Sequence, residues 1–454
     1  MQAVSWSMRI TGGWMDRKLY RFADLFSGCG GLSLGLSLAG MRGQFAIERD
    51  PMAFETFSHN FLASKRKIGF DWPSWLAKGA WDIEDLLTSH KRDLEGLRGT
   101  IDVLAGGPPC QGFSFAGRRV EDDPRNLLFK RYVDVVDALR PKVLMLENVP
   151  GMRVLHVQAN VIPIHPPKEA APKRKSFYEK LVESLDAIGY RIDARLMDAS
   201  RFGVPQKRVR LIAVGVRHDL LSGLPGGVER AFELIENARL GQLASLGLME
   251  ATSASDAISD LQVGPGGLVA CPDAGSSRFM EVVYGGPRTP YQRMMNRGLS
   301  GRMDSMRLAR HRDDIRERFA RILAECRKGV RMDDESRQKF ALKKHRIYPM
   351  AIDEPAPTIT TLPDDILHYG EPRILTVRES ARLQSFPDWF EFRGKYTTGG
   401  DRRTRECPRY SQVGNAVPPY LARAVGLGLS ALLDEIEAVH AFSDNIGTKR
   451  SAMA

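Results

Sequence analysis

The chain has 454 residues, 43% of them hydrophobic, which is enough for two or three domains that each bury a core. Its 66 Lys and Arg against 55 Asp and Glu give a formal charge of +11, which favours a nucleic-acid partner, although many soluble proteins carry a basic excess without one. The five cysteines (Cys29, Cys110, Cys271, Cys326 and Cys407) are odd in number and never spaced as Cys-x-x-Cys, so a disulfide framework and a metal site are disfavoured and a reducing cytoplasm fits best.

The first half of the chain alternates stretches that are typical of strands and helices. Strands are predicted at 22–26, 43–48, 101–105, 143–146 and 209–216. Helices are predicted between them at 30–39, 53–61 and 131–139. This alternation predicts an α/β fold with a Rossmann-like, doubly wound and mostly parallel sheet.

The pattern changes twice further along. Residues 157–176 are rich in Pro, Lys and Arg, which indicates a solvated loop or linker, with a contact to the DNA backbone as the alternative. After Arg217 the alternation is lost, and residues 302–346 hold 15 Lys and Arg against 8 Asp and Glu. One helical face there carries Ile315, Phe319, Ile322, Leu323 and Cys326. The basic residues around that face are either the solvated side of a packed helix or a phosphate-tracking surface.

A glycine-rich turn connects the first predicted strand to the first predicted helix. It runs Asp24-Leu-Phe-Ser-Gly-Cys-Gly-Gly-Leu32, and its glycines let a ligand approach the backbone at a helix N-terminus. Glu48 ends the next strand, where a carboxylate would accept a hydrogen bond from a ribose hydroxyl. Because sites for NAD, FAD and S-adenosylmethionine share such a turn, the pattern predicts a nucleotide-type cofactor without choosing among them.

Cys110 lies in the turn Ala105 to Gly117, directly after a buried strand. Two prolines stiffen this turn, and a cysteine at the carboxyl end of a parallel strand is placed for nucleophilic chemistry. The alternative is a buried structural cysteine.

An acid and two arginines follow on later strands. Glu147 ends the strand at 143–146 and can share a proton with a substrate, although a helix cap or a salt bridge is the simpler role. On another strand, Gln206, Arg208 and Arg210 occupy every second position and therefore share one face. Two arginines beside an acid can orient it, and the alternative is a charge pair on an edge strand.

Taken in order, these pieces resemble the DNA (cytosine-5) methyltransferase family of the bacterial restriction-modification type. The resemblance spans about Leu19 to Leu433. The matching stretches are Phe26-Ser-Gly28-Cys-Gly30, Pro109-Cys110-Gln111, Glu147-Asn148-Val149, the Gln206-x-Arg208-x-Arg210 signature, Arg378 to Pro387 and Gln412 to Pro419. Gln111-Gly112-Phe113-Ser114 favours DNA over the RNA-methylating relatives. Trp81 stands before Asp82 where the family often has glycine.

The resemblance implies a class I methyltransferase fold that uses S-adenosyl-L-methionine and acts on double-stranded DNA. The implied cofactor-binding residues are Phe26, Ser27, Gly28, Gly30, Gly31, Leu32, Glu48, Asp82, Pro109, Asn415, Ala416 and Val417. The implied DNA-contacting residues are Gln111, Ser114, Arg118, Arg119, Gln206, Thr360 and Thr361. Cys110 would add to C6 of a flipped-out cytosine and Glu147 would hold its N3. Arg210 would then bind the base carbonyl while Arg208 supports Glu147, and Asn148 would shape the loop.

The resemblance also implies how the chain is divided and where it acts. We expect an N-terminal arm over 1–18, a catalytic domain over 19–216, a smaller target-recognition domain with a hinge over 217–390, a return segment over 391–437 and a tail over 438–454. A companion restriction endonuclease and a cytoplasmic, nucleoid-associated location are expected, with no membrane association. The alternatives are a tRNA methyltransferase of the same fold, a catalytically silent DNA-binding relative, and a nucleotide-dependent oxidoreductase that uses the glycine-rich turn alone.

Overall fold

The computed structural model describes residues 18–63, 68–108, 128–153, 176–248, 250–344, 346–400, 402 and 405–451. Cys110 and its loop, the predicted N-terminal arm up to residue 17, and residues 157–175 of the proline-rich stretch lie outside these ranges.

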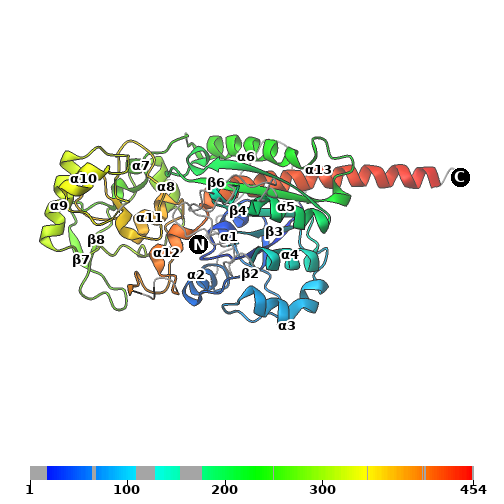
Figure 1. Ribbon diagram of the computed structural model, residues 1–454, viewed down its shortest axis with the longest axis horizontal. Helices are drawn as coiled ribbons and strands as arrows, with labels where there is room; N and C mark the ends of the chain where they lie inside the picture. The colour runs from blue at the N-terminus through cyan, green and yellow to red at the C-terminus, as the bar shows by residue number, and fades with distance from the viewer. Residues whose placement is uncertain are drawn as a thin grey trace, which may run out of the picture.

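A six-stranded sheet forms the centre of the first half of the chain, with strand order β2-β1-β3-β4-β6-β5 (Figure 1). The strands are β1 (Arg21–Leu25), β2 (Arg42–Ile47), β3 (Val103–Gly106), β4 (Val143–Asn148), β5 (Tyr190–Asp198) and β6 (Val209–Arg217). The pairs β1–β2, β1–β3 and β3–β4 are parallel, and β6 runs antiparallel to both β4 and β5. The predicted mostly parallel sheet is confirmed, and β5 is a strand that the sequence did not predict.

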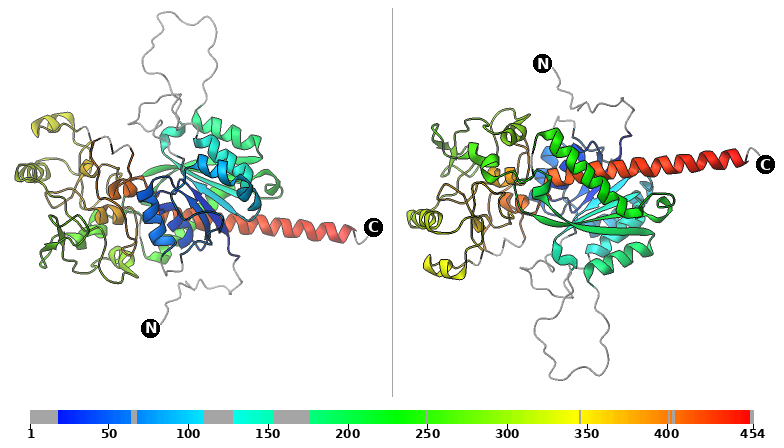
Figure 2. Two further views of the ribbon diagram at one scale, coloured as in Figure 1. Left: turned by 90° about the horizontal axis from the view of Figure 1, so that it is seen from below. Right: turned by 90° about the horizontal axis from the view of Figure 1, so that it is seen from above.

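Helices cover both faces of this sheet (Figure 2). They are α1 (Gly31–Leu38), α2 (Pro51–Phe61), α3 (Ile83–Gly96), α4 (Leu128–Leu139), α5 (Phe177–Ala187), α6 (Arg230–Leu246) and α13 (Pro419–Ser451). Side chains along a strand alternate between the two cores: Val143 and Met145 of β4 join one, and Leu144 and Leu146 join the other. This alternation explains why the strands are continuous apolar runs in the sequence.

The long helix α13 packs against α1 and α6, although it is far from α1 in the chain (Figure 1). The approach to α1 is close because Gly35 has no side chain: a Cβ there would lie 2.3 Å from Cβ of Ala422 and 2.5 Å from the carbonyl of Pro419. Within Arg409–Ala441, which includes the first part of α13, one window of 18 residues is apolar enough to cross a membrane, with a mean hydropathy of 1.3. Since 78% of that window is buried inside the protein, it belongs to the core.

A second region follows α6 and lies at the other end of the molecule from the C-terminus (Figure 1). Its elements are α7 (Ala254–Ile258), β7 (Leu268–Ala270), β8 (Met280–Val282), α8 (Pro290–Asn296), α9 (Asp313–Glu325), α10 (Asp334–Lys339), β9 (Tyr348–Pro349), β10 (Ile366–Leu367), α11 (Val377–Leu383) and α12 (Arg409–Asn415). The predicted apolar face of α9 packs into a small core through Phe319 and Ile322. The basic residues near α9 point outward, and Arg312 and Arg321 each pair with a nearby acid.

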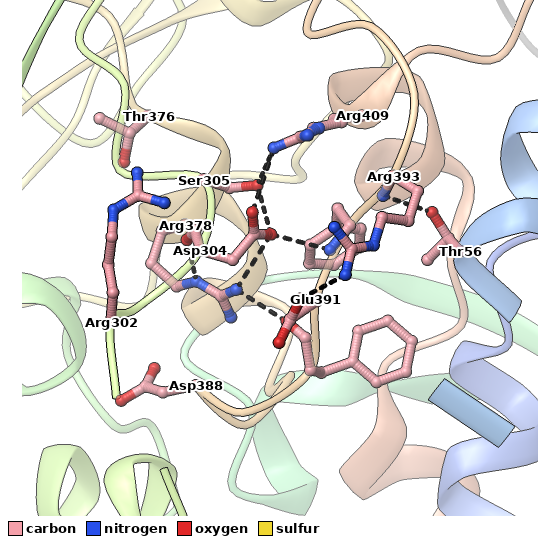
Figure 3. Close-up of polar contacts among 12 residues, drawn as sticks. Thr56, Arg302, Asp304, Ser305, Thr376, Arg378, Asp388, Glu391, Arg393 and Arg409 are labelled. Atoms are coloured by element: carbon pink, nitrogen blue, oxygen red, sulfur yellow. Dashed lines mark hydrogen bonds and ion pairs between the residues drawn. The ribbon is translucent and has the colours of Figure 1, made fainter. Parts of the chain in front are cut away.

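Polar contacts hold this second region together and join it to the sheet-bearing region. Asp304 lies between two arginines (Figure 3): the Nε of Arg378 donates to its backbone carbonyl at 2.9 Å, and Arg409 donates to its carboxylate at 3.1 Å. The backbone N–H of Arg393 donates to the hydroxyl of Thr56 on α2 at 2.8 Å. Because hydrogen bonds with a charged partner are strong, the two arginine contacts of Asp304 hold the second region together, and the contact of Arg393 with Thr56 joins this region to α2.

Candidate active site and cofactor cleft

The turn between β1 and α1 is built from residues in the left-handed backbone region. Gly28 and Gly30 have φ of 57° and 96°, and Phe26 has φ of 61° although it carries a side chain. A non-glycine residue held in this region costs free energy, and such residues gather at functional turns. The N–H of Gly30 donates to the carbonyl of Ser27 at 2.9 Å, which closes the turn at the N-terminus of α1.

Glu48 lies across this turn at the end of β2. One of its carboxylate oxygens accepts from the N–H of Gly28 at 2.9 Å, and the other accepts from the N–H of Asp50 at 2.7 Å. Burial raises the pKa of Glu48 above its ordinary value. The N–H of Trp81 donates to the Glu48 carbonyl at 2.8 Å, which brings Asp82 close, and Asp82 caps α3 by accepting from Glu84. The two predicted cofactor acids therefore lie near one another.

The chain returns from far away in the sequence to pack against the same turn. A Cβ on Gly31 would lie 2.4 Å from the carbonyl of Val417, so the start of α1 touches the segment that includes Asn415 and Ala416. The N–H of Cys407 donates to the carboxylate of Asp50 at 2.9 Å. All the predicted cofactor residues within the described ranges thus border the β1–α1 turn or the end of β2.

Two buried polar atoms beside this turn lack partners within the described residues. Asp24 is fully buried, and while one of its oxygens accepts from the Ser33 hydroxyl at 2.6 Å, its Oδ1 has no hydrogen bond. The hydroxyl of Ser27 is buried and equally without a partner. Burial raises the pKa of Asp24 to about 7. A Cβ on Gly28 would meet nothing within 4 Å, so the turn faces open space. Orphaned polar groups beside an open backbone at a helix N-terminus fit a polar nucleoside ligand such as S-adenosylmethionine.

Glu147 and Arg210 form an ion pair at the carboxyl end of β4. The Nε of Arg210 lies 2.9 Å from Oε1 of Glu147, and their side chains are 13% and 11% exposed. A Cβ on Gly107 would lie 3.3 Å from Oε2 of Glu147, so the carboxylate borders the end of β3. The side chain of Asn148 donates to the carbonyl of Pro108 at 3.1 Å and so holds the start of the loop that carries Cys110.

Six predicted site residues lie outside the described ranges and stay predictions: Pro109, Cys110, Gln111, Ser114, Arg118 and Arg119. The chain enters their segment beside Glu147, because Gly107 and Pro108 directly precede it. The cofactor turn, Glu48 and Glu147 all follow strands at the carboxyl edge of the sheet, where open α/β sheets hold their ligands.

Arg208 has other partners than the sequence predicts. It is fully buried and donates to three backbone carbonyls: Ile359 at 3.0 Å, Gly414 at 2.9 Å and Ala416 at 3.0 Å. The direct partner of Glu147 is Arg210, and the support of Glu147 by Arg208 stays a prediction. Burial lowers the pKa of Arg208.

Gln206 is also fully buried, and its amide bonds only within the protein. It accepts from the N–H of Ile359 at 2.8 Å and donates to Gln384 at 2.9 Å. This placement corrects the expected direct contact of Gln206 with DNA, because no part of its side chain reaches the surface. Thr360 and Thr361 are half-buried beside it, and the hydroxyl of Thr360 donates to Asp365 at 2.7 Å.

The structure adds site residues that the sequence did not single out. The sequence does show Asp24 as an acid within an apolar strand, and a carboxylate in such a place indicates a functional role. Cys407 carries no such signal, because its place depends on a contact with a distant segment. Gln384 lies in the matching stretch Arg378 to Pro387, but its contact with Gln206 could not be predicted from that stretch.

The sequence model of the C-5 cytosine-specific DNA methylase family matches residues 20–430. Type II methyltransferase M.DdeI of Desulfomicrobium norvegicum is 30% identical over 439 residues, which cover 94% of this chain and 92% of that protein. Type II methyltransferase M.XorII of Xanthomonas oryzae pv. oryzae is 31% identical over 424 residues, which cover 89% and 82%. A crystal structure described as a DNA modification methyltransferase encoded within an E. coli prophage has the same fold, with a TM-score of 0.58 at 24% identity over 91% of this chain and 99% of that one. The chain therefore belongs to the C-5 cytosine-specific DNA methylase family and is a DNA cytosine-5 methyltransferase.

Proposed function

We propose that the protein takes a methyl group from S-adenosylmethionine and places it on C5 of a cytosine turned out of a specific duplex DNA sequence. The observation that carries this proposal is the Glu147–Arg210 pair, which stands beside Gly107 at the same sheet edge as the glycine-rich turn. A base-holding acid and a cofactor cleft on one edge bring a pyrimidine and a methyl donor within reach of each other.

The described residues supply the groups that would hold the cofactor. Glu48 would accept hydrogen bonds from the ribose hydroxyls and Asp82 would lie toward the adenine. The orphaned oxygens of Asp24 and Ser27 would face polar groups at the amino-acid end. When bound, S-adenosylmethionine supplies the methyl group as part of a sulfonium cation.

The protein's own groups would activate the base. The thiolate of Cys110 forms a bond to C6 of the ring, and Glu147 holds N3 and shares its proton, so electron density moves to C5. Arg210 keeps Glu147 in place and binds the base carbonyl. After C5 is methylated, it loses its proton to a base, the C6–sulfur bond breaks and Cys110 leaves as a thiolate.

This chemistry requires the cytosine to leave the double helix, because its ring cannot be reached inside the base stack. Flipping costs a few kcal/mol, which contacts to phosphates and bases must offset. The second region, with its basic stretch 302–346, would provide them. Because the similar proteins are named Type II methyltransferases, we also propose a companion restriction endonuclease and a cytoplasmic location.

Methylation of plasmid DNA followed by bisulfite sequencing tests this proposal. We expect 5-methylcytosine at one recurring sequence, and none with the Cys110→Ser variant. Cys326→Ser is the matched control, because Cys326 follows α9 in the second region and should not affect transfer. Methylation of tRNA in preference to duplex DNA, or full activity of Cys110→Ser, would contradict the proposal.

A further inference from the structure

Gln206 and Arg208 together hold both backbone groups of one distant residue, Ile359. Its N–H donates to Oε1 of Gln206 at 2.8 Å, and its carbonyl accepts from Nη1 of Arg208 at 3.0 Å. The neighbouring backbone pairs as well: the N–H of Lys207 donates to the carbonyl of Ala356 at 2.8 Å. The segment 356–361 therefore lies along residues 205–208, although about 150 residues of the chain separate them.

The same two side chains hold the segment 413–416 on their other side. Nη2 of Arg208 donates to the carbonyls of Gly414 at 2.9 Å and Ala416 at 3.0 Å. Gln206 donates to Gln384, whose amide donates in turn to the carbonyl of Val413 at 2.8 Å. We call Gln206 and Arg208 the 206/208 clamp.

The two clamped segments also touch each other directly. A Cβ on Gly414 would lie 2.3 Å from the carbonyl oxygen of Thr360, so only glycine allows this backbone contact. One segment carries Thr360 and Thr361, expected to lie near DNA, and the other leads into Asn415, expected to lie near the cofactor. The 206/208 clamp thus holds both the segment expected near DNA and the segment expected near the cofactor.

The chemistry of Arg208 makes the two placements depend on each other. Burying a cation is costly unless its donors are bonded, and this guanidinium has three carbonyl acceptors from two segments. If either segment moves away, Arg208 stays buried and loses one or two acceptors, which weakens the seating of the other segment. Lysine cannot replace it, because an ammonium group lacks the planar fork that reaches both sides.

We propose that the 206/208 clamp couples cofactor binding to DNA binding, so that each ligand tightens the binding of the other through Arg208. This inference rests on the proposed use of S-adenosylmethionine and DNA. Arg208 is a positioning residue here: it touches neither ligand and acts through Ile359 and Gly414.

Fluorescence anisotropy measures the coupling with a labelled, unmethylated duplex that contains the target sequence found by bisulfite sequencing. We expect S-adenosylhomocysteine to lower the Kd for DNA in the wild type by about tenfold, within the usual range of coupling between sites. We call the Kd for DNA without S-adenosylhomocysteine, divided by the Kd with it, the coupling ratio. In Arg208→Lys this ratio should fall below about twofold. In each protein, DNA should lower the Kd for S-adenosylhomocysteine by the same factor, because coupling is reciprocal. Lys207→Met is the matched control: Lys207 is an exposed neighbour paired with Glu354, and its loss should leave the ratio unchanged.

Gly414→Ala separates the two segments while leaving the clamp side chains in place, so it should lower the ratio as Arg208→Lys does. Circular dichroism and thermal unfolding identify variants that remain folded. A coupling ratio near one in the wild type would contradict the proposed coupling. The same holds if the folded Arg208→Lys and Gly414→Ala proteins bind both ligands more weakly but keep the coupling ratio of the wild type. Failure of the wild type to methylate any duplex would instead sink the proposed function.

Discussion

Replacing Asp24 with asparagine should remove a pH dependence from the stability of the fold. Asp24 is fully buried, its Oδ1 has no partner, and its other oxygen accepts from the Ser33 hydroxyl on α1. Burial raises its pKa from 3.8 to about 7, and the nearby carboxylate of Glu48 adds to the rise. Asparagine keeps the shape and can still accept from Ser33, but it cannot ionise.

The direction in which stability changes with pH follows from the raised pKa of Asp24. The stability that the protonated Asp24 contributes is fully present below about pH 4, where the unfolded chain also keeps the proton, and it is lost as the pH rises to about 7. Since each unit of pKa shift corresponds to 1.36 kcal/mol, the loss should amount to roughly 4 kcal/mol at most. The free energy of unfolding of Asp24→Asn, minus that of the wild type, should therefore rise by about 1 kcal/mol per pH unit between pH 4 and 7 and then level off.

Urea unfolding followed by circular dichroism at pH 5, 6, 7 and 8, without cofactor, measures this difference. Asp313→Asn is the control, because that side chain is 94% exposed and its substitution reports the effect of removing one surface charge. If the difference in unfolding free energy between Asp24→Asn and the wild type stayed constant from pH 5 to 8, Asp24 would not have a raised pKa in the folded protein.

Three further substitutions test other parts of the structure. Arg210→Ala should lower methyl transfer by about 100-fold or more while changing the Kd for DNA far less, because it leaves a buried carboxylate unpaired at the base-holding site; equal losses in single-turnover rate and in DNA binding would argue against that role. Gly35→Ala should destabilise the fold by about 1–3 kcal/mol, because the new methyl group collides with α13. Gly241→Ala should stabilise it by about 0.5–1 kcal/mol, because Gly241 lies within α6 with open space around it. Urea midpoints that move in the same direction for both variants would contradict this. Arg382→Met should lower the free energy of unfolding by about 3–5 kcal/mol, because two buried carboxylates lose their cation, and a thermal midpoint equal to that of the wild type would be inconsistent with this buried network.

The parts of the site that the sequence predicted are local patterns. Glu48 and Glu147 each follow an apolar run, and parallel strands bring the ends of such runs to one edge of the sheet. The glycine-rich turn is also local, since Gly28 and Gly30 occupy the left-handed conformations that their positions require. These features need no knowledge of distant contacts.

The partners of Arg208 could not be predicted in this way. They are backbone carbonyls 151 to 208 residues away in the chain, and a carbonyl has no signature in the side-chain sequence. The direct bond of Arg210 to Glu147 was also one of two possible pairings until the strands were placed. The contacts of these arginines therefore could not be predicted from the sequence, and their roles stay predictions.

Strand β5 was missed for a different reason. It lies at the edge of the sheet, and charged residues such as Arg191 and Arg195 are exposed along it. An edge strand keeps one side partly in water, so its apolar residues do not form a continuous run. Its pairing with β6 becomes visible only when the sheet is assembled.

The sulfur of Cys110 should form a bond to C6 of the target cytosine during methyl transfer. A duplex carrying 5-fluorocytosine at the mapped site tests it, because fluorine at C5 cannot leave as a proton and the bond to sulfur cannot be released. Incubation with S-adenosylmethionine should yield a protein–DNA complex that survives denaturing electrophoresis, with the DNA attached to the peptide that contains Cys110. An active enzyme that forms no such complex, or forms it through another residue, would contradict the account.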